Sequence, residues 1–395
     1  MPERGQVAGG RGAEPLPRRA GVTDAVAAVD PTRKSRYRRK NRHRTSLRVE
    51  IVRSLDDLRH DWTVLAAASS NVFATWEWAR TWWNHYGRER PLAIAALTRP
   101  DGTVAGIVPM YRFASRPIAI GRLIGHGPAD QQGPICAPAD LPEVSRSIVA
   151  AVEAVKFTVA LLERLPANLD WQGATGGRRL STEPSPVLSL TARTWDELLA
   201  GWSTKRRGKM RAIERRLARE HDHRYVLTTG AESLSADLDV LFELHRARWG
   251  RQSEFLAAEA FHRDFARTAL ERGWLRLWRL EIDGCPVAAH HGLRFADAEY
   301  AYQAGREPGW EDYEVARALW LHTIRAGLES GATEYRFLRG EEPYKMRFAT
   351  HDHGIMSIGI GRGPAGRTIV TVADRLARSP ARRLLRGALD ARKRA

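Results

Sequence analysis

Cysteine is nearly absent from this chain. Its two cysteines, Cys136 and Cys285, lie far apart, and neither has a second cysteine at CxxC spacing. They cannot supply the disulfide framework of a small secreted protein or a four-cysteine zinc site. This usage is typical of a reducing compartment, and we expect the protein to be cytoplasmic.

Long apolar runs are missing as well. No stretch approaches the roughly 20 apolar residues that span a bilayer, so we expect no transmembrane segment. The N-terminus lacks the continuous apolar stretch of a signal peptide, because Asp24 and Asp30 bracket its one Ala/Val-rich patch. Clustered metal ligands are also scarce. The adjacent His290 and His291 fall in an expected strand, where neighbouring side chains point to opposite faces, so we predict no metal site.

Acidic residues are too few to balance the basic ones at the two ends of the chain. The formal net charge is +17, to which residues 1–46 contribute +8 and residues 363–395 contribute +7, leaving +2 for residues 47–362. Basic ends of this kind contact RNA or an anionic membrane surface, or they are solvated tails. The composition alone leaves both interpretations open.

The chain does have enough apolar sequence for two domains. It contains 395 residues, of which 43% are apolar, so it can bury substantial cores. We predict a disordered basic arm over residues 1–46, α/β domains over residues 47–190 and 191–362, and a basic helical tail over residues 363–395.

Tryptophans are concentrated in one expected helix of the first domain. Residues 73–83 read FATWEWARTWW, with Thr75 as the expected N-cap. Trp78, Trp82 and Tyr86 are spaced four residues apart and therefore share one face. That face forms either an aromatic wall of a substrate cleft or, more commonly, a surface packed on a sheet.

A polar loop follows an expected strand of the same domain. Residues 125–138 include His126, Asp130, Gln131 and Gln132. A polar loop at the end of a strand can hold a ligand, whereas His126 by itself is equally typical of an ordinary loop.

Residues 299–349 organise the second domain. An aromatic-rich strand over residues 300–303 leads through a loop over residues 305–311 to a helix whose expected N-cap is Asp312. A short strand is expected over residues 335–338. A strand that leads through a loop into a helix N-terminus presents free backbone N–H groups, which suit a phosphate or pyrophosphate.

The order of elements in the second domain resembles the GNAT acyltransferase fold. The chain resembles the CelD-like GNAT N-acyltransferases, whose double-domain architecture is similar to that of the Fem aminoacyl transferases of peptidoglycan synthesis. The likeness covers about residues 47–361 and rests on residues 73–83, 241–249 (LFELHRARW), 302–310 and 337–348 (FLRGEEPYKMRF). It implies an α/β (α+β) fold of two tandem GNAT-like domains, with mixed, largely antiparallel sheets flanked by helices.

The resemblance also implies a reaction. An acyl group would pass from an acyl-CoA, with acetyl-CoA as the expected co-substrate, to an amine of a small or cell-envelope-related acceptor, and no permanently bound cofactor is expected. Tyr302 and Tyr344 are the implied catalytic residues, because a tyrosine often protonates the leaving thiolate in this fold. The implied donor-binding residues are Arg306, Asp312, Tyr313 and Lys345.

These assignments have structural alternatives. Tyr344 and Phe348, four residues apart, would pack a helix on the core while Lys345 is solvated, and Tyr302 would be an aromatic packed on its sheet. Arg306 would be an ordinary loop arginine.

The chain departs from the GNAT pattern at the pyrophosphate loop. The usual Q/R-x-x-G-x-G/A sequence is replaced by residues 306–311 with only the first glycine, and Glu311, Asp312 and Glu314 place negative charge where phosphates would lie. A different donor, a shifted donor and lost activity are all compatible with this departure.

Two other functions therefore stay open. Residues 205–216 contain seven Lys or Arg, which would grip tRNA in a Fem-like aminoacyl-tRNA-dependent transferase or form a solvated helix face. The weak pyrophosphate loop also fits a non-catalytic scaffold of an envelope polysaccharide pathway. We expect nucleic acid contact only through this segment or the basic ends, and peripheral membrane contact only through the ends.

Overall fold

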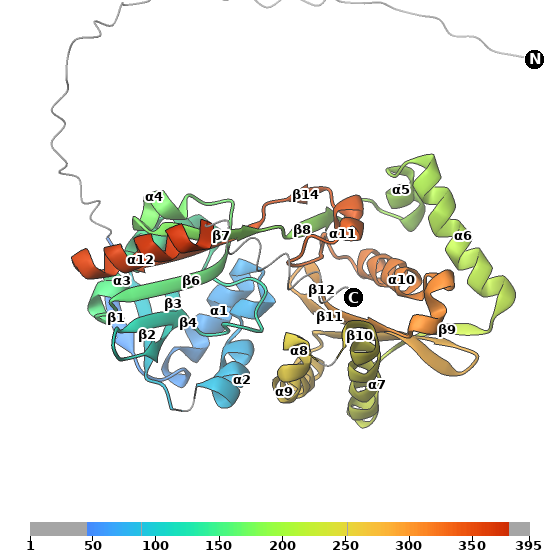
Figure 1. Ribbon diagram of the computed structural model, residues 1–395, viewed down its shortest axis with the longest axis horizontal. Helices are drawn as coiled ribbons and strands as arrows, with labels where there is room; N and C mark the ends of the chain where they lie inside the picture. The colour runs from blue at the N-terminus through green and yellow to red at the C-terminus, as the bar shows by residue number, and fades with distance from the viewer. Residues whose placement is uncertain (1–45, 88, 251, 379–395) are drawn as a thin grey trace, which may run out of the picture. The chain divides into compact units, whose positions relative to one another are not determined.

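The computed structural model describes residues 46–378 apart from residues 88 and 251 (Figure 1). The predicted basic arm over residues 1–46 therefore lies almost wholly outside the described residues, as does the last part of the predicted C-terminal tail.

The first half of the chain builds most of one sheet. Its path is β1-β2-β3-β4-β6-β15-β7, and β5 pairs with β3 beside this path. Neighbours are antiparallel except β4 and β6, which are parallel. The strands are β1 (Arg48–Val52), β2 (Leu92–Thr98), β3 (Val104–Ala114), β4 (Ile120–Leu123), β5 (Ile135–Cys136), β6 (Val159–Pro166), β7 (Arg178–Glu183) and β15 (Ile355–Gly361).

The second sheet repeats this arrangement. Its order is β9-β10-β11-β12-β13-β8-β14, and its one parallel pair, β12 with β13, again occupies the fourth and fifth places. The strands are β8 (Pro186–Ser189), β9 (His223–Leu227), β10 (Leu275–Ile282), β11 (Cys285–Phe295), β12 (Ala298–Arg306), β13 (Glu334–Arg336) and β14 (His351–Asp352).

The two halves exchange strands. β8 precedes the predicted boundary at residue 190 but pairs with β13 in the second sheet. β15 comes late in the chain but pairs with β6 and β7 in the first sheet. The predicted boundaries at residues 190 and 362 therefore do not divide the two sheets, because the chain crosses between the sheets twice.

Helices cover both sheets. The basic segment over residues 205–216 lies in α6, which the short helix α5 precedes. The predicted tail begins with α12, which packs on β15 and β7 (red in Figure 1). The helices are α1 (Arg59–Ser69), α2 (Trp76–Tyr86), α3 (Leu141–Ala154), α4 (Trp171–Thr175), α5 (Trp195–Ala200), α6 (Thr204–Glu220), α7 (Ala231–Trp249), α8 (Glu254–Ala257), α9 (Glu259–Glu271), α10 (Val315–Glu329), α11 (Pro343–Phe348) and α12 (Gly363–Arg378).

The tryptophan helix α2 lies between the halves. Thr75 caps it as predicted, since its hydroxyl accepts a hydrogen bond from Trp78 N at 3.2 Å. Trp78 is 0% exposed, and its ring lies 5.0 Å from that of Phe261 and 4.6 Å from that of Phe265, both on α9. Edge-to-face packing of this kind joins the halves in one apolar core.

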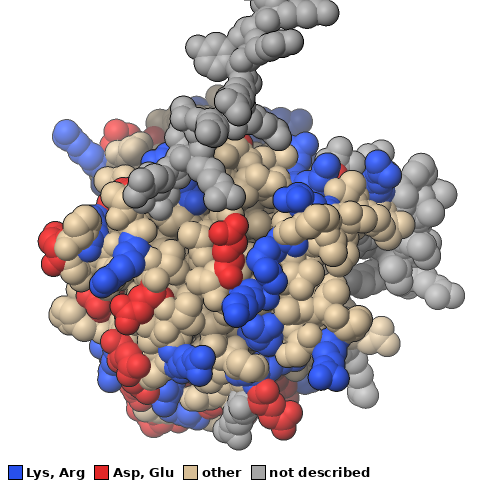
Figure 2. Space-filling model, turned by 90° about the vertical axis from the view of Figure 1, so that its left-hand side faces the viewer, with Lys and Arg blue, Asp and Glu red and all other residues tan. Residues whose placement is uncertain are grey.

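The described surface mixes both signs of charge. Lys and Arg alternate with Asp and Glu over the face shown in Figure 2. This agrees with the small net charge of residues 47–362. Within the described residues, no helix is both long and apolar enough to cross a membrane.

Candidate active site

The parallel strands β12 and β13 separate soon after they pair. Residues 298–300 pair with residues 334–336, after which β12 continues to Arg306 while β13 ends. The chain after β13 turns away through Leu338 and Gly340, whose φ angles are 59° and 134°. This separation leaves the backbone at the end of β12 unpaired on the side of β13 among the described residues, while its other side stays paired with β11.

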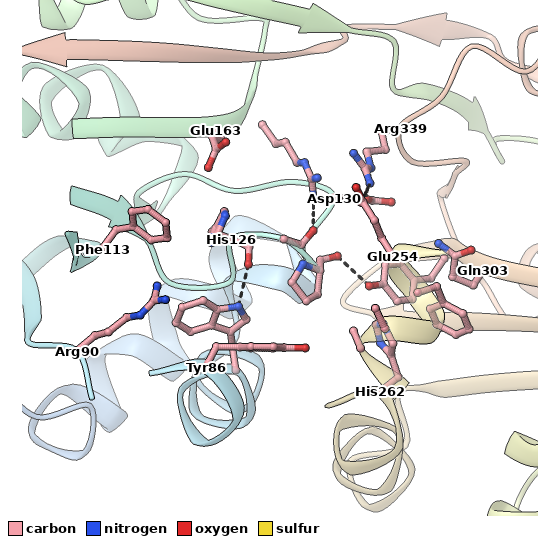
Figure 3. Close-up of a pocket in the computed structure, with 18 residues that line it drawn as sticks. Tyr86, Arg90, Phe113, His126, Asp130, Glu163, Glu254, His262, Gln303 and Arg339 are labelled. Atoms are coloured by element: carbon pink, nitrogen blue, oxygen red, sulfur yellow. Dashed lines mark hydrogen bonds and ion pairs between the residues drawn. The ribbon is translucent and has the colours of Figure 1, made fainter. Parts of the chain in front are cut away.

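Three cavities follow the separated strands. The helix cavity, of about 370 Å³, lies at the start of α10. The wedge cavity lies between β12 and the segment after β13, and the interface cavity, of about 510 Å³, lies between the two halves (Figure 3). Arg248, Ala304, Trp320 and Tyr344 line both the helix and wedge cavities. Asp130, Tyr302, Gln303 and Arg339 line both the wedge and interface cavities.

The helix cavity carries a surplus of positive charge. It is lined by Arg248, Arg306 and Arg317 against Glu311 and Glu314. Both carboxylates have cationic partners, because Arg306 binds Glu311 and Arg317 binds Glu314. One nitrogen of Arg306, Nη1, is buried and has no hydrogen-bond partner among the described residues. An anion in this cavity would satisfy it.

The start of α10 differs from the prediction. Asp312 is not the N-cap: it lies in the 3₁₀ helix Pro308–Tyr313, and α10 begins at Val315 after Glu314 at φ 51°. The prediction was wrong because a turn of 3₁₀ helix precedes α10. The Asp312 carbonyl accepts a hydrogen bond from Arg216, and neither Asp312 nor Tyr313 is among the residues that line the helix cavity.

Tyr313 packs outward from this turn. Its ring lies 4.9 Å from that of His221, and its hydroxyl donates to Glu220 at 3.0 Å. The lining of the helix cavity therefore does not support the predicted donor-binding role of Asp312 and Tyr313, which stays a prediction.

Tyr344 and Lys345 lie at the wedge. Tyr344 packs edge-on against Trp320 at 4.5 Å, and burial raises its pKa to about 12, so it stays protonated. Lys345 is buried and donates to the Arg339 carbonyl at 2.6 Å, besides pairing with Glu342 at 3.0 Å. The alternative of a solvated Lys345 is therefore wrong. The alternative in which Tyr344 packs with Phe348 on the core is right only in part, because Tyr344 also lines two cavities.

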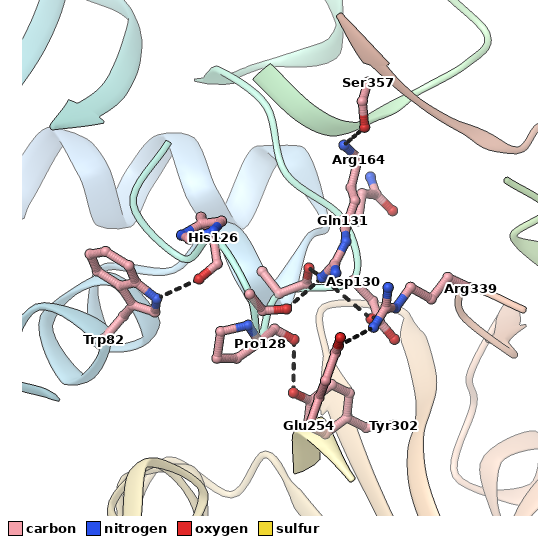
Figure 4. Close-up of polar contacts among 12 residues, drawn as sticks. Trp82, His126, Pro128, Asp130, Gln131, Arg164, Glu254, Tyr302, Arg339 and Ser357 are labelled. Carbon is pink, nitrogen blue, oxygen red and sulfur yellow. Dashed lines mark hydrogen bonds and ion pairs between the residues drawn. The ribbon is translucent and has the colours of Figure 1, made fainter. Parts of the chain in front are cut away.

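Tyr302 is aimed by a β-bulge. His291 pairs with Gln303 and Gly292 with Ala301, so Tyr302 is the extra residue on β12. Its side chain is 7% exposed, and its hydroxyl donates to the Pro128 carbonyl at 2.8 Å (Figure 4). Burial raises its pKa well above the usual value. In this arrangement Tyr302 holds the loop over residues 125–138, and its hydroxyl hydrogen is used in the hydrogen bond to Pro128.

The loop over residues 125–138 does reach the site, as its polar composition suggested. Asp130 is buried at the junction of the wedge and interface cavities, where it pairs with Arg339 at 2.8 Å and lies 3.9 Å from Arg164 (Figure 4). Burial raises the pKa of Asp130. Sequence analysis assigned no role to Arg164, Gln303 or Arg339, although the last two lie in segments that carry the family resemblance, because single polar residues of these types are common.

Part of the second half resembles a known protein family. Residues 204–346 match the family described as acetyltransferase (GNAT) domain. Those residues are therefore similar to a GNAT acetyltransferase domain. They contain β12, α10, β13 and most of α11, which are the elements that surround the helix and wedge cavities.

Solved structures are similar over both halves of the chain. FemX is 11% identical with a TM-score of 0.58, covering 80% of this chain and 98% of its own. The C-terminal domain of a putative lysylphosphatidylglycerol synthetase from Agrobacterium fabrum is 12% identical with a TM-score of 0.52, covering 81% and 96%. No curated protein matches. The predicted fold of two tandem GNAT-like domains, with mixed sheets flanked by helices, is confirmed.

Proposed function

We propose that the protein transfers an acyl group from an acyl-CoA, acetyl-CoA in the simplest case, to a primary amine. The observation that carries this proposal is the continuous lining from the helix cavity through the wedge to the interface cavity. A donor in the helix cavity and an acceptor in the interface cavity would meet beside β12. Holding two reactants in this way supplies much of the rate of an acyl transfer.

The helix cavity fits the phosphates of the donor. The unpartnered nitrogen of Arg306 and the surplus positive charge favour an anion, and the first turn of α10 adds backbone N–H groups. Glu311 and Glu314 oppose an anion less than the sequence suggested, because Arg306, Arg317 and Lys209 pair with them. The site therefore supports a donor close to the usual GNAT position.

The residues at the wedge can move the two protons of the reaction. The amine nitrogen attacks the thioester carbonyl carbon, a C–N bond forms, and the C–S bond breaks. Asp130 takes the proton that the nitrogen loses, and its raised pKa makes it a better base than an exposed carboxylate. Tyr344, protonated up to about pH 12, gives a proton to the departing sulfur.

Thiol release from a panel of acyl-CoAs, measured with a panel of primary amines, tests the proposal. We expect amine-dependent thiol release with at least one donor, and a fall of about 100-fold or more in Asp130→Asn. Asp140→Asn is the matched control, since Asp140 pairs with Arg99 at 2.6 Å and lines none of the three cavities. Failure of every acyl-CoA to bind would instead favour a non-catalytic scaffold.

An aminoacyl-tRNA-dependent transferase is the second candidate. The exposed side of α6 carries Lys205, Arg211 and Arg215, and only Arg211 of these three has an ion-pair partner among the described residues. Salt-sensitive tRNA binding that is lost on replacing these three residues by Ala would favour this candidate. Unchanged tRNA binding in that variant would exclude α6 as the contact.

A further inference from the structure

We propose that the acceptor is a primary amine on a planar ring that carries an anionic group, a carboxylate or phosphate, at its far end. This inference rests on the proposed function, since it names the substrate class of the interface cavity. The amine end would lie at Asp130 and Gln303, the ring on Tyr86 and Phe113, and the anion at Arg90. All five residues line the interface cavity, and Figure 3 shows the aromatic group and Arg90 apart from Asp130 and Gln303.

Two β-bulges direct side chains into this cavity from opposite halves. Tyr302 is the extra residue on β12. Phe113 is the extra residue on β3, because Arg112 pairs with Gly121 and Ala114 with Ile120. A bulge re-aims the side chain that it carries, and bulges are frequent beside active sites. One bulged residue from each sheet, Phe113 and Tyr302, therefore lines the cavity.

The aromatic end of the cavity is open to a ligand. Tyr86 is 37% exposed and Phe113 is 36% exposed, which makes them two of the few large apolar side chains so exposed among the described residues. Both lie in the same cavity, and Trp82 packs behind Tyr86 at 5.5 Å. Exposed aromatic faces grouped in one cavity are typical of a site for a flat, partly apolar ligand.

The positive charge of Arg90 is available to an anionic ligand at this end of the cavity. Its guanidinium lies over the Phe113 ring at 4.8 Å and contacts the Tyr111 hydroxyl at 3.4 Å, and no ion pair is seen for it among the described residues. His126 cannot compete for an anion, because burial lowers its pKa to about 4. Arg122 donates to His126 Nε2, so His126 Nδ1 carries the hydrogen and donates to Tyr111.

The local charge supports an anion at this end. Glu163 also lines the cavity, and Arg122 lies 3.6 Å from it. Since Arg122 offsets Glu163, Arg90 leaves this end with a positive surplus. At the opposite end, Arg339 pairs with both Asp130 and Glu254, and Arg164 lies 3.9 Å from Asp130, so the two carboxylates are offset. This end offers the Asp130 carboxylate to an amine as a hydrogen-bond acceptor, whereas the end at Arg90 favours an anion. An acceptor with an amine at one end and an anionic group at the other fits both.

Binding of three small probes tests the inference without relying on turnover. The probes are 4-(aminomethyl)benzoate, benzylamine and benzoate, titrated into the full chain and followed by quenching of tryptophan fluorescence and by calorimetry. We expect 4-(aminomethyl)benzoate to bind about tenfold more tightly than benzylamine, as a charge-assisted hydrogen bond to Arg90 provides. Arg90→Ala should abolish this preference, and Arg90→Lys should restore part of it.

Arg59→Ala is the matched control, because Arg59 likewise lies over an aromatic ring, that of Trp76 at 4.4 Å, but lines none of the three cavities. Equal binding of the two amines, absence of binding by either, or a preference that persists in Arg90→Ala would overturn the inference. The same probes are then supplied with acyl-CoA. Preferential binding without thiol release would leave the ligand class standing and count against the acyl transfer itself.

Discussion

The two halves of the molecule have the same arrangement of strands in their sheets but differ in their similarity to the GNAT family. Each sheet has four antiparallel strands, a parallel fifth and two further antiparallel strands, and the sixth strand comes from the other half of the chain. Only the second half matches the GNAT acetyltransferase family. The shared architecture is thus not accompanied by the same sequence pattern in both halves.

The difference is visible at the parallel pair of each sheet. Gly121 is the middle one of the three β4 residues that pair with β6, and Glu299 is the middle one of the three β12 residues that pair with β13. The two residues therefore occupy equivalent positions in the two sheets. Gly121 is covered by Phe157, whereas Glu299 reaches Gly327 on α10. Beyond β4 the chain turns into the loop over residues 125–138, which contributes Asp130 to the cavities of the second half. Under the proposed function, the second half would hold the donor, and the first would supply a wall and a base for the acceptor.

Separating the halves gives the largest expected effect. If residues 46–190 and 191–378 are expressed as two chains, the first lacks β15 and the second lacks β8. Each would expose unpaired strand edges and the apolar residues around α2 and α9. We expect neither piece alone to unfold cooperatively and a mixture to recover the transition, as measured by circular dichroism during thermal unfolding. A cooperative transition in the second piece alone would show that β8 is dispensable.

Removing the hydroxyl of Tyr344 tests whether catalysis belongs to the second half. Tyr344→Phe loses the proposed proton donor at the wedge while keeping the packing on Trp320, so we expect kcat to fall about 100-fold and donor affinity to change little. Steady-state rates and calorimetric binding of the acyl-CoA measure the two separately.

Tyr313→Phe serves as the control for this change. Tyr313 loses only its hydrogen bond to Glu220 outside the cavities, so its rate should match that of the wild type. Equal losses in both variants would argue against Tyr344 as the acid and would restore a direct role for the predicted Tyr313.

β12 packs so closely on α7 that we expect any side chain at Gly305 to destabilise the fold. A Cβ there would lie 2.3 Å from the backbone nitrogen of His245, whereas a Cβ at Gly309 meets nothing within 4 Å. We expect Gly305→Ala to lower the free energy of unfolding by about 3 kcal/mol and Gly309→Ala by less than about 0.5 kcal/mol. Urea unfolding monitored by tryptophan fluorescence distinguishes them. A loss of similar size in both would mean that β12 can move away from α7.

Local signals in the sequence predicted much of the fold. The spacing of Trp78, Trp82 and Tyr86 indicated a helix with an aromatic face, and that face both packs in the core and lines the interface cavity, so the two alternatives were not exclusive. Thr75 was correctly read as a cap, because capping depends on neighbouring residues alone. Periodicity could not reveal the exchange of β8 and β15, since pairing between distant strands leaves no local pattern.

The site was harder to predict than the fold. Tyr302, Tyr344, Arg306 and Lys345 do line the linked cavities, but Asp312 and Tyr313 point elsewhere because a 3₁₀ turn displaces the start of α10. Their functional roles stay predictions. Buried ion pairs such as Asp130 with Arg339 join residues more than 200 positions apart, and one sequence carries no record of such a contact.

The buried carboxylate of Glu299 is expected to make the stability depend on pH. It is 6% exposed, and burial raises its pKa to about 7 from 4.5. The folded protein therefore keeps a proton between about pH 4.5 and 7 that the unfolded chain releases, so stability falls as pH rises through this window, by up to about 3 kcal/mol. Glu299→Gln should remove this part of the pH dependence.

Urea unfolding from pH 4.5 to 8 measures the change in slope, which matters more than the absolute stability because the variant also loses its contacts with Arg276 and Arg294 at 3.6 and 3.5 Å. Glu329→Gln, at the exposed end of α10, is the control and should retain the slope of the wild type. Parallel profiles for Glu299→Gln and the wild type would mean that the two arginines keep Glu299 ionised. In that case the contrast with Gly121 would be one of packing, without a difference in protonation between the halves.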